Sequence, residues 1–159
     1  MNKLPRKRLV AIVTVALLLT GGGIAFAYWS AGGAGTGSAT TGTSVPITAV
    51  QTSTITNMRP GDSAQTLSGN FTNTNSGPVY VTSVVASIAS VTKAVGAPVG
   101  TCDATDYTLA SATMTVNAEV AAGTAVGAWT GATIKFNDKV ATNQDACKGA
   151  TVNLAYVVN

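Results

Sequence analysis

The chain has 159 residues, of which nine are basic, six are acidic and none is histidine. The absence of histidine removes the commonest general base and the usual ligand of catalytic zinc, and no catalytic or nucleotide-binding motif occurs, so we expect a protein that is not an enzyme. Four basic residues lie among the first eight positions; the rest of the chain has five basic residues against six acidic ones, a net charge of −1. Without a basic surface, nucleic acid is not an expected partner.

Residues 1–27 have the pattern of a bacterial export signal. A basic start is followed by the apolar stretch 9–19 and by three glycines. Ala25 and Ala27 supply the small residues that a signal peptidase requires, which predicts cleavage before Tyr28. The alternative is an uncleaved anchor, because the uncharged stretch that ends at Trp29 is long enough to span a bilayer. We favour cleavage and a secreted, extracellular or cell-surface product, which meets the membrane only through its signal peptide before cleavage.

Residues 28–44 form a low-complexity segment of Gly, Ser, Ala and Thr. This composition is typical of a flexible linker. However, Ala34, Thr36, Ser38 and Thr40 alternate with other small residues, so the segment also fits a flat strand that depends on its neighbours for register. The sequence leaves both interpretations open, and we favour the strand.

Residues 45–159 are predicted to form one all-β domain. They are rich in Thr, Val, Ala and Ser, and β-branched residues with a spacing of two favour strands. The pattern predicts roughly seven to nine short strands in a two-sheet sandwich of jelly-roll or immunoglobulin-like type, and it does not decide between the two. The clearest strands are expected at residues 45–56, 64–73, 79–91, 107–117, 129–137 and 151–158.

Three local patterns refine this prediction. Pro60 and Gly61 are suited to the central positions of a type II turn. The inward residues of segment 79–91 change parity, which predicts a bulge or break near Ser83. The last predicted strand alternates cleanly, so its apolar residues are expected to face the core: Val152, Leu154, Tyr156 and Val158.

The only two cysteines, Cys102 and Cys147, are predicted to form one structural disulfide. An even number of cysteines in an exported chain without histidine favours this bond over a metal site. The bond would bring Asp103 and Asp106 near Asp145, and calcium binds such oxygen donors in loops. Two interpretations follow: an ordinary polar loop held by a disulfide, which we favour, and a calcium site formed by the three carboxylates. No other cofactor is indicated.

Short motifs in the first half of the chain resemble those of a known family. Residues 21–30 join a glycine run to small residues and an aromatic pair, residues 57–63 contain a Pro-Gly-Asp turn, and residues 71–77 are rich in Asn and Gly. These motifs are similar to the SipW-dependent signal peptides and mature starts of TasA/camelysin-type secreted matrix proteins. The C-terminal half, as at residues 143–150, resembles small secreted proteins of unassigned role from high-GC Gram-positive bacteria.

The resemblance implies a jelly-roll-like sandwich in the extracellular matrix of a Gram-positive biofilm. We therefore expect a structural surface protein that associates with itself and forms filaments by donating the strand 34–44 to a neighbour. The alternative is a monomeric cell-wall-associated module that binds a glycan or a protein. Its site would include Tyr107, Trp129, or the region of Asp103 and Asp145. Some members of that family are described as metallopeptidases. We do not expect this activity here, because the chain contains no histidine.

Overall fold

The computed structural model describes residues 32–159. The predicted signal peptide, with Ala25, Ala27 and Tyr28, lies outside this range, as do the first residues of the predicted N-terminal segment. The chain divides into two units between Thr40 and Thr41. The first unit is described only over residues 32–40, which are exposed and have no regular secondary structure.

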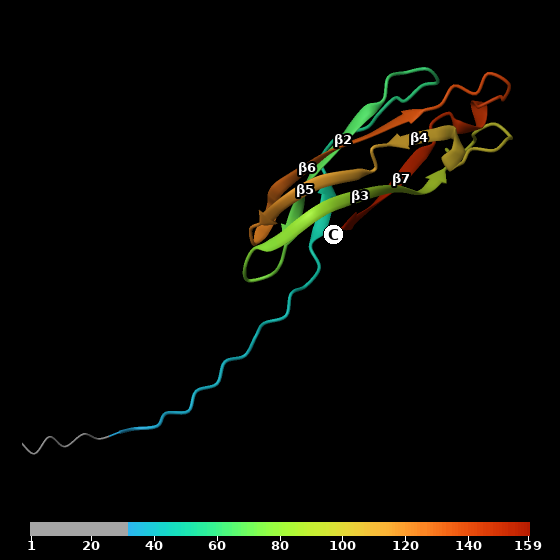
Figure 1. Cartoon of the computed structure of the whole chain (residues 1–159). Helices are drawn as coiled ribbons and strands as arrows, with labels where there is room; N and C mark the ends of the chain where they lie inside the picture. Colours follow the sequence, from blue (N-terminus) through green and yellow to red (C-terminus); the bar gives the residue numbers. More distant parts are fainter. Residues whose placement is uncertain (1–31) are drawn as a thin grey trace, which may run out of the picture. The chain divides into compact units, whose positions relative to one another are not determined.

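The second unit is a β-sandwich of two antiparallel sheets, which confirms the predicted fold class (Figure 1). One sheet has the order β1-β2-β6-β4 and the other has the order β5-β3-β7. The strands are β1 (Thr48–Gln51), β2 (Gln65–Asn73), β3 (Val79–Thr92), β4 (Tyr107–Ala110), β5 (Thr113–Val120), β6 (Gly123–Phe136) and β7 (Thr151–Val158). Two short 3₁₀ helices, η1 (Ala104–Asp106) and η2 (Asp145–Cys147), lie in the connecting loops.

Two of the predicted strands are shorter than expected. The strand expected at 45–56 is reduced to β1, because the main chain leaves the sheet after the amides of Thr52 and Ser53 both donate to the carbonyl of Ser68. The prediction of one continuous strand at 107–117 is wrong. Ser111 has a positive φ of 50°, and the chain there passes from β4 in one sheet to β5 in the other.

Strand β6 is longer than predicted, because glycine-rich bulges hide its pattern. Its register against β2 shifts three times, and each shift leaves one additional residue on β6. Gly131, Gly127 and Ala125 lie at these three places with positive φ values of 127°, 61° and 55°. A bulge interrupts the alternation of inward and outward side chains, so the first part of β6 does not have a strand-like sequence.

The core lies between the two sheets, and β3 contributes to it with the predicted change of parity. Val81 and Val84 are both buried, although three positions separate them. The register between β3 and β5 shifts between Val81 and Ser83, which confirms the irregularity predicted near Ser83. The additional residue lies on β5, where Asn117 has a φ of 46°.

Trp129 and Tyr156 join the two sheets at the centre of the core. Their ring centroids lie 4.7 Å apart, and the Trp129 indole N–H donates to the carbonyl of Asn70 at 2.9 Å. Trp129 is 2% exposed and lies directly against Gly69 on the neighbouring strand. The indole therefore fits in this position only because residue 69 is a glycine and has no side chain.

We expect Gly69→Ala to lower the free energy of unfolding by about 2–3 kcal/mol. The added methyl group would overlap both the Val50 carbonyl oxygen and the Trp129 ring, and neither a strand backbone nor a buried indole is free to move away. Urea unfolding monitored by Trp fluorescence measures the loss. Gly77→Ala is the matched control, because a Cβ at that position meets nothing within 4 Å. Equal stability of the two variants would contradict this account.

Candidate functional site: a groove bordered by disulfide-linked loops

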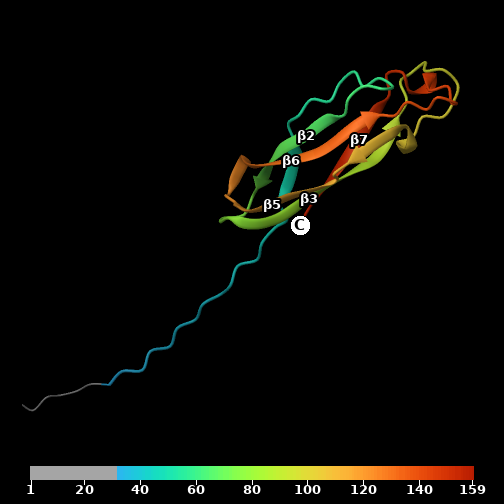
Figure 2. The same ribbon diagram turned by 45° about the horizontal axis from the view of Figure 1, so that its top comes forward.

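Three loops, 52–64, 93–106 and 137–150, lie together at one end of the sandwich (Figures 1 and 2). The registers explain this: Gln65 at the start of β2 pairs with Ile134 near the end of β6, and the last residue of β3 pairs with the first residue of β7. We call this end the disulfide end. The opposite end contains residues 41–47, the β2–β3 loop and the β5–β6 link.

The charged side chains are concentrated at the disulfide end. Of the five basic and six acidic residues in the range 32–159, only Lys135 and Glu119 lie in strands. The others lie in the three loops: Arg59, Asp62, Lys93, Asp103, Asp106, Asp138, Lys139, Asp145 and Lys148. The sheets therefore present nearly uncharged outer faces, and most of the charged residues of the domain lie at one end.

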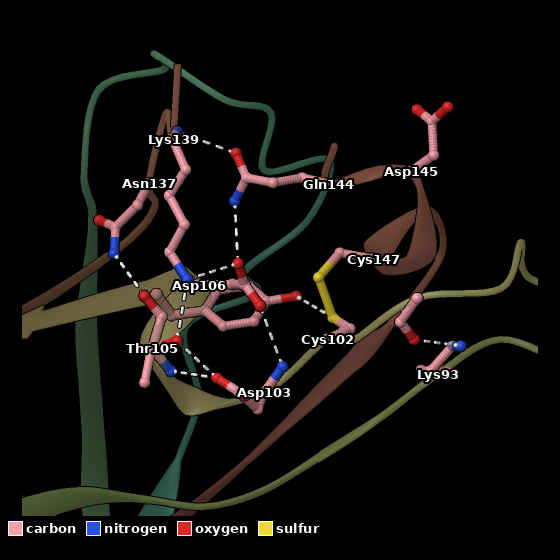
Figure 3. Close-up of a disulfide and its surroundings, with 12 residues drawn as sticks. Lys93, Cys102, Asp103, Thr105, Asp106, Asn137, Lys139, Gln144, Asp145 and Cys147 are labelled. Atoms are coloured by element: carbon pink, nitrogen blue, oxygen red, sulfur yellow. Dashed lines mark hydrogen bonds and ion pairs between the residues drawn. A yellow bond between two sulfur atoms is a disulfide. The ribbon is translucent and has the colours of Figure 1, made fainter. Parts of the chain in front are cut away.

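A disulfide between Cys102 and Cys147 links two of these loops, as predicted (Figure 3). The Cα atoms lie 5.1 Å apart. Cys147 packs with the rings of Tyr107 and Phe136, whose centroids are 5.1 Å apart, in a small apolar cluster separate from the main core. The Tyr107 hydroxyl lies 3.9 Å from the Cys102 sulfur, and burial raises the pKa of this phenol.

Asp106 is the buried polar centre of the same end. Its carboxylate pairs with the Lys139 ammonium at 2.9 Å and accepts hydrogen bonds from the Gln144 amide and the Asp103 backbone N–H, each at 3.0 Å (Figure 3). Burial alone would raise its pKa, but these three donors together outweigh burial and hold the pKa below the ordinary value. Lys139 also donates to the Thr105 hydroxyl at 2.8 Å. One carboxylate thus connects η1 to the 137–150 loop.

The three aspartates considered for calcium do not converge. Asp103 caps η1 by accepting from the Thr105 hydroxyl and backbone N–H, which lower its pKa. Asp145 points away from this pair and bonds Lys148 at 2.8 Å, which lowers its own pKa (Figure 3). Within residues 32–159, the one group with metal-ligand spacing is Asp106 with Cys102 and Cys147, and both sulfurs belong to the disulfide. This geometry corresponds to a polar loop held by a disulfide.

A groove of about 960 Å³ runs beside these loops. Apolar side chains from the 52–64 loop and from the facing strands line it: Ile55, Met58, Ile134, Phe136, Val152 and Leu154. Polar side chains, among them Lys139 and Gln144, also line it. Its charged lining residues are Arg59, Asp138, Lys139, Asp145 and Lys148, so the groove combines an apolar wall with a charged rim.

Sequence reasoning located only part of this site. The disulfide was predicted, whereas residues 52–56, part of the groove wall, had been assigned to a strand. Lys139 was also missed, because its partner Asp106 lies far away in the sequence. Tyr107 and Trp129, suggested as exposed glycan-binding residues, are only 8% and 2% exposed and are unable to stack on a sugar.

No family model, no curated protein and no solved structure matches this chain. In the part of the chain that the structure describes, no helix has the length and apolar character needed to cross a membrane.

We expect Asp106→Asn to lower the free energy of unfolding at pH 7 by about 2 kcal/mol, because Lys139 loses its charged partner while solvent partly screens the exposed ammonium. The lowered pKa of Asp106 means that its carboxylate stabilises the fold above the unfolded pKa, near 3.8, and that this contribution disappears as the pH falls through the folded value. Urea unfolding at successive pH values should therefore show that the free energy of unfolding falls less at acidic pH in the variant than in the wild-type protein. Asp138→Asn, an exposed change in the same loop, is the control; an equal fall in Asp106→Asn and in the wild-type protein would contradict the assignment.

Removal of the disulfide should lower the free energy of unfolding by about 4 kcal/mol, since the bond closes a loop with a sequence separation of 45. The double variant Cys102→Ser, Cys147→Ser and the reduced wild-type protein should show the same loss in urea unfolding. Oxidised wild-type protein is the reference. A reduced protein as stable as the oxidised one would show that the loops are held by the Asp106 contacts alone.

Proposed function

We propose that this protein is a secreted structural subunit that assembles with itself into filaments, each subunit donating its N-terminal segment to the groove of the next. One spatial observation carries the proposal: the N-terminal segment joins the domain at the end opposite the groove. A segment that leaves one end of a subunit and a groove at the other end favour head-to-tail contacts, and such contacts do not close into a dimer.

The point at which the segment joins is held by a chain of amide hydrogen bonds. Buried Asn73 donates to the carbonyls of Gly77 and Val120, and its side-chain oxygen accepts from the backbone N–H of Asn75 at 3.0 Å. The Asn75 side chain in turn exchanges two hydrogen bonds with the backbone of Val45, at 2.7 and 2.9 Å. Residues before Val45 therefore start from a defined place at the opposite end.

The receiving edge is strand β7. It pairs only with β3, has eight residues and contains no charged residue, glycine or proline. The other sheet edges are protected: β1 and β4 have only four residues each, and β5 contains both Glu119 and the bulge at Asn117. Short strands, charges and bulges are the usual protection against edge pairing, so β7 is the edge suited to another strand. Val152 and Leu154 of β7 line the groove.

The N-terminal segment has the properties of a donor. Residues 32–44 are exposed and are in neither sheet. Their small side chains suit a narrow groove, and the main chain of a donated strand supplies most of its affinity through hydrogen bonds. The alternative of a monomeric glycan-binding module loses support, because its aromatic candidates are buried.

Proline substitutions in the donor should prevent assembly. Gly37→Pro, Ser38→Pro and Thr40→Pro together remove backbone N–H groups on both sides of the strand, so at least one N–H that faces the receiving edge is lost, in a region outside the folded sandwich. We expect the wild-type exported chain to form filaments in electron micrographs and this triple variant to remain monomeric in size-exclusion chromatography with light scattering.

The matched control replaces the same three residues with alanine, which keeps the backbone N–H groups and should retain assembly. Deletion of residues 28–44 should give a folded monomer with the far-UV circular dichroism of the parent domain. Filaments formed by the deletion variant would overturn strand donation, and a wild-type chain that stays monomeric at high concentration would overturn self-assembly itself.

A further inference from the structure

Three valines at the disulfide end have fully exposed side chains. Val95, Val99 and Val140 are 107%, 105% and 96% exposed, and the other exposed large hydrophobic residues in the range 32–159 are at most 59% exposed. Single exposed apolar residues are ordinary on protein surfaces, but these three are the most exposed of the large hydrophobic residues described, and all three lie on loops at the disulfide end. We call these three residues the valine tip.

Two of the valines occupy the tips of tight turns. The Ala97 N–H donates to the Ala94 carbonyl at 3.1 Å, which puts Val95 at the second position of a turn. The Thr142 N–H donates to the Lys139 carbonyl at 2.9 Å, which puts Val140 at the same position of another turn. Exposed turns favour Gly, Pro, Asn, Asp and Ser. Valine gains nothing there from its own subunit, since each of these side chains is exposed.

Lysine side chains hold both loops in shape. Lys93 donates to the carbonyls of Pro98 and Gly100, at 3.1 and 3.0 Å, within its own loop. Lys139 is bound to Asp106 and Thr105, as described above. The ammonium groups are therefore engaged within the domain, and the loops present valine outward in a preorganised form. Preorganisation reduces the entropy that binding would otherwise cost.

We propose that the valine tip is the apolar contact between successive subunits and packs on the opposite end of a second copy of this chain. This inference rests on the proposed function, because head-to-tail strand donation makes the disulfide end of one subunit face the opposite end of another. Val140 also lines the groove, so one residue of the tip borders the surface that would receive the donated strand.

The opposite end has the chemistry that a valine tip requires. Val45 and Tyr80 are 55% and 59% exposed there. Residues 41–47, the β2–β3 loop and the β5–β6 link contain no charged residue; Glu119, which pairs with Tyr80, is the nearest charge in the strands. The proposed contact therefore buries the valines on Val45 and these loops and leaves Glu119 and the charged side chains of the disulfide end in water. Stripping water from an ion is the main cost of placing charges in an interface.

The test compares the triple variant Val95→Ser, Val99→Ser, Val140→Ser with wild-type chain in the concentration dependence of assembly, measured by sedimentation and electron microscopy. We expect the critical concentration to rise by about tenfold or more, since three apolar contacts per interface are lost. Val50→Ser, a change of the same chemistry at a 40% exposed position on β1 that does not line the groove, is the matched control and should shift the critical concentration by less than about threefold.

The outcomes separate this inference from the proposed function. A wild-type chain that does not assemble overturns both. Assembly that the proline variant abolishes and the valine variant leaves unchanged overturns the valine tip alone. Unaltered urea unfolding of the valine variant is expected, because each replaced side chain is exposed, and it excludes misfolding as the cause of a loss.

Cross-linking identifies the occupant. Mixing a Val95→Cys chain with a Tyr80→Cys chain under mild oxidation should give the mixed disulfide dimer in excess over either symmetric dimer. A predominance of Val95→Cys homodimers would indicate tip-to-tip association and overturn the proposal. Co-sedimentation of the wild-type chain with phosphatidylcholine vesicles, lost in the valine variant while assembly persists, would assign the tip to a lipid surface instead.

Discussion

The disulfide end depends on one buried carboxylate and one covalent bond that act together. Asp106 and the Cys102–Cys147 bond hold loops that no sheet hydrogen bonds support, because the strands have ended before these loops meet. A disulfide restricts the unfolded chain, whereas the carboxylate specifies the folded arrangement through bonds to Gln144 and Lys139. Both act on the 137–150 loop, which borders the groove.

Much of the fold was predictable because most strands keep a simple alternation. Strand β2 alternates along its buried part and strand β7 alternates except at Ala155, so their inward faces follow from the sequence. The errors have a common physical cause in positive φ angles. Ser111 ends a strand within a continuous β-like sequence, and the bulges at Gly127 and Gly131 conceal a strand that exists. The local pattern of apolar and polar residues does not reveal a residue with a positive φ, because the free energy that this conformation costs is offset by tertiary packing.

The candidate site was less predictable than the fold. The two cysteines predict their own bond, but the buried carboxylate of this end could not be chosen from sequence among Asp103, Asp106 and Asp145. Burial decides between them: Asp106 is 4% exposed, whereas the other two stay at the surface with local partners. The groove was beyond sequence reasoning, because it arises where a chain segment leaves the sheet instead of continuing it.

The distribution of charge connects the sandwich to assembly. A domain with nearly uncharged sheet faces has little electrostatic repulsion between copies, so it must control association through its edges. Three of its four edges are short, charged or bulged, and one is not. The edge at β7 is unprotected and lies beside the groove. In a protein that stays monomeric, such an edge would allow uncontrolled pairing with other chains. Under the strand donation that we propose, the same edge would give association a single direction, and the Asn73–Asn75–Val45 hydrogen bonds would keep that direction by fixing where the strand begins.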